Sequence, residues 1–224
     1  MAPQTNTEQE FSDTLSARLS AAAYEPFLWL GERRGMRERR RSLLAEARGR
    51  VLEIGAGTGL NAALYPNGVE ELHLVEPDPA MARKLRASAA ASGKAVAVVE
   101  APAESLPFED ASFDTVVSTM VLCTAAEPRK ALAEVSRVLR PDGRFLFCEH
   151  VLSDSPRLAR WQHRLAGAWA AFAEGCRCNQ GTLAMIEERL SVERVERERW
   201  RGTPPLVHPL VVGAATPHKP ASGS

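Results

Sequence analysis

The stretch Val51-Leu-Glu-Ile-Gly-Ala-Gly-Thr-Gly59 is an apolar run that ends in three glycines at alternate positions. A second apolar run, Leu72-His-Leu-Val-Glu76, follows it and ends on a carboxylate. The first run predicts a buried parallel strand, and the glycines let the backbone turn sharply and lie close to a ligand. Folds of this kind place a carboxylate about 20 residues beyond the turn, where it accepts hydrogen bonds from ribose hydroxyls. The two runs therefore predict a pocket for a nucleotide-like ligand, with Glu76 as the partner of the sugar.

The spacing of the glycines argues against a nicotinamide cofactor. A dinucleotide fingerprint requires G-x-G-x-x-G/A, but Leu60 stands three residues after Gly57, and Gly59 comes one place early. A cradle for a pyrophosphate is therefore poorly supported. A glycine motif is a weak signal by itself, and the alternative is a tight turn from strand to helix that binds no ligand.

The order of apolar and turn-forming segments predicts an α/β fold. Apolar runs predict strands, and helical spacing predicts helices between them. The expected strands are 51–54, 72–75, 95–99, 113–118, 144–149, 191–200 and 206–215, and the expected helices are 61–64, 79–92, 128–139, 156–174 and 182–190. Strands that alternate with helices indicate a mostly parallel sheet covered on both faces, and the short last connection requires an antiparallel last strand.

The chain is long enough for one domain. Its 224 residues include 45% hydrophobic residues, enough for a core. We expect a disordered tail at 1–13, a single domain at 14–216 and a flexible tail at 217–224. Apolar residues at helical spacing within 14–48, before the first strand, predict a helical segment that could act as a lid.

The charge balance of the chain indicates which class of partner to expect. The 28 basic residues balance the 28 acidic ones, so no net field attracts nucleic acid or an anionic membrane, and a small-molecule partner is expected. The start of the chain is polar and no stretch reaches the roughly 18 apolar residues of a membrane span, which predicts a cytoplasmic protein. Oligomeric state leaves no signal in the sequence.

The cysteines are expected to be reduced thiols. Cys123, Cys148, Cys176 and Cys178 are few and scattered, unlike a disulfide scaffold. Cys176 and Cys178 with His163 offer metal-binding side chains, but their C-x-C spacing is poor for a structural zinc site. We therefore expect no metal ion.

Several motifs in order resemble the class I S-adenosylmethionine-dependent methyltransferases of the methyltransferase type 11 group. They are Val51–Gly59, Glu76-Pro-Asp78, Ala103-Glu-Ser-Leu-Pro107, Phe113-Asp114 with Leu122, and Leu139-Arg-Pro-Asp-Gly143. The resemblance implies a Rossmann-like sheet of seven strands with a reversed last strand, S-adenosyl-L-methionine as cofactor and S-adenosyl-L-homocysteine as product. The cofactor-binding residues that it implies are Glu53, Gly55, Ala56, Gly57, Gly59, Glu76, Pro77, Ala103, Glu104, Ser118 and Thr119. Pro102 stands where the group commonly has an Asp that meets the adenine amine.

The second half of the chain is similar to the thiol S-methyltransferase-like proteins of the methyltransferase-like 7 group. The matching residues are Thr119-Met-Val-Leu-Cys123, Glu149-His-Val151, Trp161, Trp169, Gly175-Cys176 and the run from Pro205 to Gly213. This likeness implies methyl transfer to a thiol. Those relatives begin with an apolar membrane-anchoring segment, which this chain lacks, so a membrane-bound role is not expected to carry over.

Two residues at the end of the fifth strand are the candidates for catalysis. His150 lies at the edge where ligands bind in open α/β sheets, and an imidazole with a pKa near 6.5 could take a proton from a thiol or phenol. Glu149 could orient His150 or touch the cofactor, although neighbours on a strand face opposite sides. The alternative is that His150 only caps the strand end.

Aromatic residues predict an apolar pocket for the acceptor. The candidates are Trp29, Cys123, Trp161, Trp169 and Phe172, of which Trp161, Trp169 and Phe172 share one helical face with Leu165. The alternative for these side chains is ordinary core packing.

Three other functions stay open at this point. Within the enzyme class they are C-methylation of a quinone-like ring and O- or N-methylation of a natural product or lipid. The third is a non-catalytic module that binds S-adenosylmethionine. Methylation of nucleic acid is disfavoured because Ser118-Thr-Met-Val121 stands where an N/D-P-P-Y tetrad would follow the fourth strand.

Overall fold

The computed structural model describes residues 29, 31–173 and 175–218. The tail expected at 1–13, most of the first half of the expected lid segment and the end of the tail expected at 217–224 lie outside the described residues. None of the described helices is long and apolar enough to cross a bilayer.

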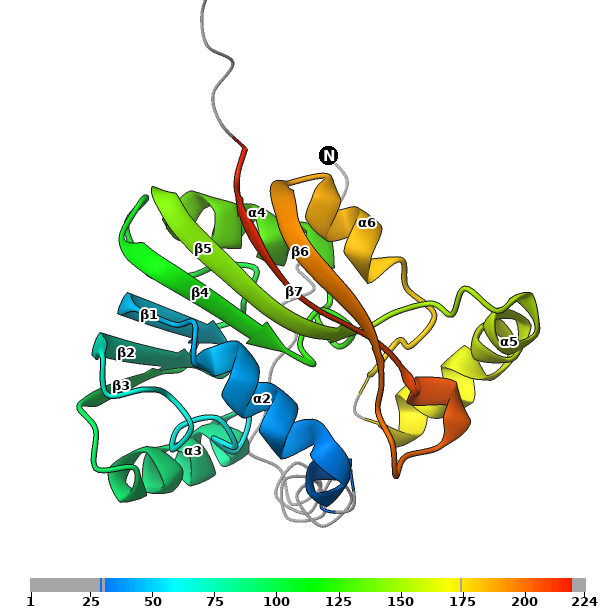
Figure 1. The fold of residues 1–224 in the computed structure, drawn as a ribbon. Coiled ribbons are helices and arrows are strands. Elements are labelled where there is room, and N and C mark those ends of the chain that lie inside the picture. The colour runs from blue at the N-terminus through cyan, green and yellow to red at the C-terminus, as the bar shows by residue number, and fades with distance from the viewer. Residues whose placement is uncertain (1–28, 30, 174, 219–224) are drawn as a thin grey trace, which may run out of the picture.

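Seven strands form one sheet, as the sequence predicts (Figure 1). They are β1 (Gly49–Ile54), β2 (Val69–Val75), β3 (Val96–Val99), β4 (Phe113–Thr119), β5 (Leu139–His150), β6 (Leu190–Arg199) and β7 (Pro209–Pro217). Their order across the sheet is β3-β2-β1-β4-β5-β7-β6. The first five strands pair in parallel, and β7 runs antiparallel between β5 and β6. The predicted α/β fold with a reversed last strand is therefore confirmed.

Helices cover both faces of the sheet (Figure 1). They are η1 (Glu32–Met36), α2 (Arg37–Leu44), α3 (Pro79–Ala91), α4 (Pro128–Val138), α5 (Pro156–Phe172), α6 (Thr182–Glu187) and η2 (Pro205–Val207). Residues of α2 and α3 are buried in one apolar cluster, and residues of α4 and α6 are buried in the other. The second half of the expected lid segment thus packs on the sheet as α2.

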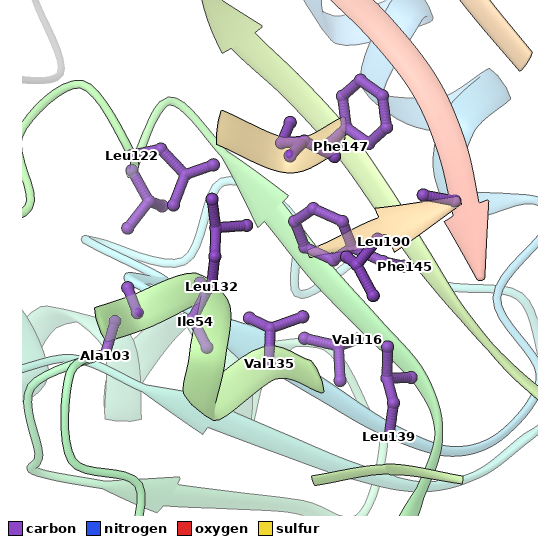
Figure 2. Close-up of a cluster of buried hydrophobic side chains, with 14 of the residues drawn as sticks. Ile54, Ala103, Val116, Leu122, Leu132, Val135, Leu139, Phe145, Phe147 and Leu190 are labelled. Carbon is purple, nitrogen blue, oxygen red and sulfur yellow. The ribbon is translucent and has the colours of Figure 1, made fainter. Parts of the chain in front are cut away.

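The alternation of side chains along each strand produces these two clusters. Val51 of β1 belongs to the cluster under α2 and α3, whereas Leu52 and Ile54 belong to the cluster under α4 and α6. Figure 2 shows the latter, where Phe145 and Phe147 of β5 lie with the leucines and valines of β4 and α4. Because both faces of the central strands are buried, segments such as Val51–Ile54 of β1 and Val116–Val117 of β4 are largely apolar.

Local sequence signals explain where α3 begins. Asp78 caps the helix, because its carboxylate accepts hydrogen bonds from the backbone N–H groups of Ala80 at 2.7 Å and Met81 at 2.9 Å. Pro79 occupies the first helical position, where its missing N–H costs nothing. The cap expected at Asp78 is confirmed.

Some local expectations were wrong. The last strand, expected from residue 206, begins at Pro209, because Pro205–Val207 form the short helix η2. The helix expected at 61–64 is a series of turns, closed by hydrogen bonds such as Ala62 N to Gly59 O at 3.1 Å. These bonds join residue i to residue i−3, whereas an α-helix joins residue i to residue i−4, so the segment is not an α-helix. The fifth strand begins at Leu139 and not at 144, because residues 140–143 bulge out of the ladder between the Phe113–Leu139 and Thr115–Arg144 pairs.

The strand order places the ligand-binding edge. Chain order reverses between β1 and β4, and parallel strands point their carboxyl ends to the same edge. Open α/β sheets bind ligands at such a switch point. A ligand is therefore expected at the loops that follow β1, β2, β4 and β5.

Candidate active site

The loop after β1 holds its three glycines in conformations that other residues avoid. Gly55 and Gly57 have φ of 55° and 57°, in the left-handed region. A Cβ on Gly55 would lie 2.6 Å from a methyl carbon of Val121, so the loop packs directly against the segment after β4. A Cβ on Gly57 would meet no described atom within 4 Å. Gly57 therefore presents bare backbone to open space, as close approach by a ligand requires.

Glu76 lies directly against this loop. Its carboxylate accepts hydrogen bonds from the backbone N–H groups of Gly57 at 2.8 Å and Asp78 at 3.0 Å. The backbone N–H of Ala56 also donates to Val75 O at 2.9 Å, which joins the ends of β1 and β2. The structure thus brings Glu76 and the glycine loop together, as the sequence predicts. Contact of Glu76 with a ribose stays a prediction.

The residues of this edge fit an adenosyl cofactor. A surface hollow is lined by Arg40, Glu53, Gly55, Ala56, Gly57, Thr58, Leu60, Asn61 and Thr119. The Thr58 hydroxyl, in a side chain that is 2% exposed, has no hydrogen-bond partner among the described residues. A buried hydroxyl of this kind is costly unless a ligand or water satisfies it. Open space above Gly57, the orphan hydroxyl and the carboxylate of Glu76 together suit a ligand with several polar groups.

A buried polar network supports the loop from below. Glu53 accepts hydrogen bonds from Asn61 Nδ2 at 2.8 Å and from the Tyr65 hydroxyl at 2.6 Å. Burial raises the pKa of Glu53 to about 7, although these two hydrogen bonds and Arg40 oppose the rise. The observed contacts of Glu53 hold the loop in place, and its contact with the cofactor stays a prediction.

Arg40 connects this network to α2. Its guanidinium donates to Asn61 Oδ1 at 3.2 Å and to the Thr119 hydroxyl at 2.9 Å, and it pairs with Glu32 at 3.1 Å. Sequence analysis missed Arg40, Asn61 and Tyr65. Asn61 and Tyr65 could have been identified as polar residues that closely follow the glycines. Nothing in the local sequence distinguishes Arg40 from its arginine neighbours.

The other expected cofactor residues lie at the same edge or beside it. Ser118 and Thr119 end β4 and are buried. Ala103 is buried in the apolar cluster of Figure 2, and Glu104 accepts a hydrogen bond from the backbone N–H of Glu127 at 3.1 Å. Pro77 follows Glu76 directly. Their contacts with a cofactor stay predictions.

Glu149 holds the segment that follows β4. Its carboxylate accepts hydrogen bonds from the Ser118 hydroxyl at 2.5 Å and from the backbone N–H groups of Val121 and Leu122, both at 3.1 Å. The side chain is fully buried, and burial raises its pKa while these donors oppose the rise. Met120 has φ of 63°, an uncommon conformation for a residue with a side chain. The observed contacts of Glu149 are thus those of a positioning residue for a strained turn, and its expected catalytic role stays a prediction.

His150 lies beside two cysteines. Its Nδ1 atom is 3.5 Å from Sγ of Cys123 and 3.5 Å from Sγ of Cys176, and the two sulfurs are 3.6 Å apart. The other ring nitrogen, Nε2, is buried without a hydrogen-bond partner among the described residues, and the ring lies against Trp200 with centroids 5.4 Å apart. Trp200 and Cys176 are neighbours that sequence analysis did not assign to His150.

The two thiols differ in acidity. Their mutual hydrogen bond, followed by the contact with His150, lowers the pKa of Cys176, and the same hydrogen bond with burial raises the pKa of Cys123. The two thiols therefore titrate as an interacting pair. All four cysteines of the chain are free thiols in this structure.

The aromatic residues of the expected acceptor pocket are mostly exposed. Trp29, Trp161 and Phe172 are 55%, 55% and 66% exposed. Trp169 contacts Phe172, with ring centroids 5.7 Å apart, and its side chain reaches Cys176. The alternative of core packing is therefore wrong for Trp161 and Phe172, because most of the surface of α5 is not covered by described residues. Their role as an acceptor pocket stays a prediction.

Comparisons with known proteins agree with this geometry. Residues 52–147 match the family model described as a methyltransferase domain. Over 198 residues the chain is 34% identical to human thiol S-methyltransferase TMT1B, with 81% of this chain and 80% of that protein covered. It is 40% identical over 114 residues to the demethylmenaquinone methyltransferase of Clavibacter sepedonicus, which covers 50% of this chain and 45% of that protein.

A solved structure shares the fold. The crystal structure of an S-adenosylmethionine-dependent methyltransferase from Thermotoga maritima superposes with a TM-score of 0.65 at 21% identity. The match covers 89% of this chain and 97% of that one. At this level of identity the likeness supports the architecture of the sheet and its helices.

Proposed function

The chain belongs to the class I S-adenosylmethionine-dependent methyltransferases, in the family of thiol S-methyltransferase TMT1B, and we propose that it methylates the sulfur of a small, apolar thiol. One observation carries the choice of acceptor. The similarity to TMT1B extends over 81% of the chain, far beyond the methyltransferase domain at residues 52–147. The relative that acts on demethylmenaquinone matches only 50% of the chain. The part of the chain outside the cofactor motifs therefore supports a thiol as the methyl acceptor.

The residues at the ends of β1 and β2 are proposed to bind the cofactor. Gly55, Gly57 and Gly59 let the backbone approach it, Glu76 accepts hydrogen bonds from the ribose, and Thr58 supplies the hydroxyl that lacks a partner. Pro77, Ala103 and Glu104 are proposed to border the adenine, and Ser118 and Thr119 the methionine part. When bound, S-adenosyl-L-methionine supplies an electrophilic methyl group on a sulfonium.

The work left to the protein is alignment and exclusion of water. Holding two reactants in line can contribute roughly 7–11 kcal/mol. A thiol with a pKa of about 8.5 is already partly ionised at neutral pH and strongly nucleophilic, so it needs less help from a base than an alcohol. The cluster of His150, Cys123 and Cys176 lies at the carboxyl end of β4 and β5 and is proposed to face the acceptor. Glu149 is proposed to fix the segment that carries Cys123.

A matched acceptor panel tests the proposal. The purified protein is incubated with S-adenosylmethionine and an aryl thiol, the corresponding phenol, the corresponding amine or a reduced quinone, and S-adenosylhomocysteine and the methylated products are measured by mass spectrometry. We expect turnover of the thiol at least ten times faster than of the phenol or amine. Methylation of the quinone ring with an inert thiol would favour the C-methylation alternative. Cofactor binding by calorimetry without product from any acceptor would favour a non-catalytic module.

A further inference from the structure

Three buried side chains from distant parts of the chain converge on one point. Cys123 follows β4, His150 ends β5 and Cys176 follows α5, and they are 1%, 4% and 6% exposed. Their ligand atoms form a nearly equilateral triangle with edges of 3.5, 3.5 and 3.6 Å. Cysteine sulfur and histidine nitrogen are both ligands that zinc prefers.

The size of this triangle matches a tetrahedral zinc site. With Zn–S of about 2.3 Å and Zn–N of about 2.0–2.1 Å, tetrahedral angles place two sulfurs about 3.8 Å apart and each sulfur about 3.6 Å from the nitrogen. The observed edges agree with these values to within roughly 0.2 Å. We propose that Cys123, His150 and Cys176 bind one zinc ion in a Cys₂His site whose fourth position is open to the acceptor thiol.

Hydrogen bonds to the backbone hold the three ligands in place. The N–H of Arg177 donates to Cys123 O at 2.7 Å, which ties the two cysteine-bearing segments together. The Thr182 hydroxyl donates to His150 O at 2.8 Å. Glu149 fixes the backbone just before Cys123, as described above. The triangle is therefore built by the fold, which favours a site with a fixed geometry over a chance cluster of thiols.

The number of ligands indicates a catalytic and not a structural ion. Structural zinc sites have four protein ligands, whereas catalytic sites have three and leave one position for water or substrate. Among the described residues, no fourth His, Cys, Asp or Glu side chain joins this group. Coordination through Nδ1 puts the imidazole proton on Nε2, which is buried without a hydrogen-bond partner among the described residues. The proposal departs from the expectation of no metal, which considered only the local pair Cys176 and Cys178 with His163.

The role of the ion rests on the proposed function. An acceptor thiol that binds at the open position releases its proton to solvent and remains as a thiolate. Its sulfur forms a bond to the methyl carbon as the bond from that carbon to the sulfonium sulfur breaks, and the electron pair stays on the departing sulfur. The neutral thioether is a weaker ligand than the thiolate, so it leaves and the next thiol can bind. A soft thiolate suits such a site better than a phenol or an amine does.

Metal binding is tested on the full, reduced chain without reference to activity. The protein is stripped with a chelator and titrated with Zn²⁺ against a chromophoric competitor, and then with Co²⁺. We expect one equivalent of either metal and tetrahedral Co²⁺ absorption with a thiolate-to-metal band. Zinc-edge absorption spectroscopy is expected to show two sulfurs at about 2.3 Å and one nitrogen at about 2.0–2.1 Å.

Cysteine variants provide the matched comparison. Cys123→Ser and Cys176→Ser are each expected to weaken Zn²⁺ binding at least 100-fold, whereas Cys178→Ser, a buried cysteine outside the triangle, keeps one equivalent. The cobalt spectrum of the unaltered chain decides the matter even if a variant fails to fold. Absence of stoichiometric metal in the reduced protein, or thiol methylation at full rate after complete metal removal, would overturn the proposal. Zinc bound by the triangle with no thiol turnover would support the metal site and refute the proposed acceptor, so the two failures are distinguishable.

Discussion

Thr58→Val is expected to change stability and cofactor affinity in opposite directions. The Thr58 hydroxyl is buried without a partner among the described residues, and such a group costs about 1–3 kcal/mol. Valine has nearly the same shape and no hydroxyl, so the ligand-free variant should be more stable by about 1 kcal/mol. If the hydroxyl meets the cofactor, its removal costs a hydrogen bond of about 0.5–1.5 kcal/mol, which weakens binding roughly three- to tenfold.

Thr115→Val is the matched control. The Thr115 hydroxyl is fully buried but donates to Arg48 O at 3.0 Å and accepts from Arg48 N at 3.2 Å. Its loss should lower the free energy of unfolding by about 1–3 kcal/mol and leave cofactor affinity unchanged. Urea unfolding of the ligand-free proteins and calorimetric titration with S-adenosylhomocysteine measure both quantities. A destabilised Thr58→Val with unaltered affinity would refute the role given to this hydroxyl.

Three further predictions concern the same edge of the sheet. Glu76→Gln should raise the Kd for S-adenosylhomocysteine at least tenfold, because hydrogen bonds to a charged group contribute about 1.5–3 kcal/mol; an unchanged Kd would remove Glu76 from the site. Gly55→Ala should destabilise the ligand-free protein more than Gly57→Ala, since only the former meets Val121 at 2.6 Å, and equal unfolding midpoints in urea would contradict this reading of the loop. Glu53 has its pKa raised from 4.5 to about 7, so the native state keeps a proton that the unfolded chain loses, and its contribution to stability falls as the pH rises through this window. Glu53→Gln should remove up to about 3 kcal/mol of that decline, seen as converging unfolding curves at pH 5 and 7.5; a decline of the same size in both proteins would show that Glu53 does not cause it.

The sequence predicts those parts of the fold whose signals lie in residues that are adjacent in the chain. The run from Val51 to Gly59 and the carboxylate of Glu76 identify two neighbouring strand ends, because residues within one strand and its turn are adjacent in the chain. The cap at Asp78 is a local signal of the same kind. The turns at 61–64 escaped prediction because the Asn61 side chain binds Glu53 from a neighbouring strand, a contact that local spacing does not encode.

The cluster around His150 shows the opposite case. Cys123 and Cys176 stand 27 and 26 residues from His150, on segments that only the folded sheet brings together. Local spacing directed attention to Cys176 with Cys178 and His163. In the structure, His163 instead lies 3.2 Å from the Asn179 side chain. Sequence patterns do not identify side chains that are brought together by the order of the strands and not by their spacing along the chain.

The central place of β7 has a consequence for biosynthesis. β7 separates β5 from β6, and among the described residues β6 pairs with no strand other than β7. During translation, β6 therefore has no strand to pair with until β7 has been made. Until then His150 lies on an unpaired edge of the sheet, because its partner residue, Leu210, belongs to β7. The strands that carry the glycine loop can thus pair early, but the edge of β5 that ends at His150 stays unpaired until β7 has been made.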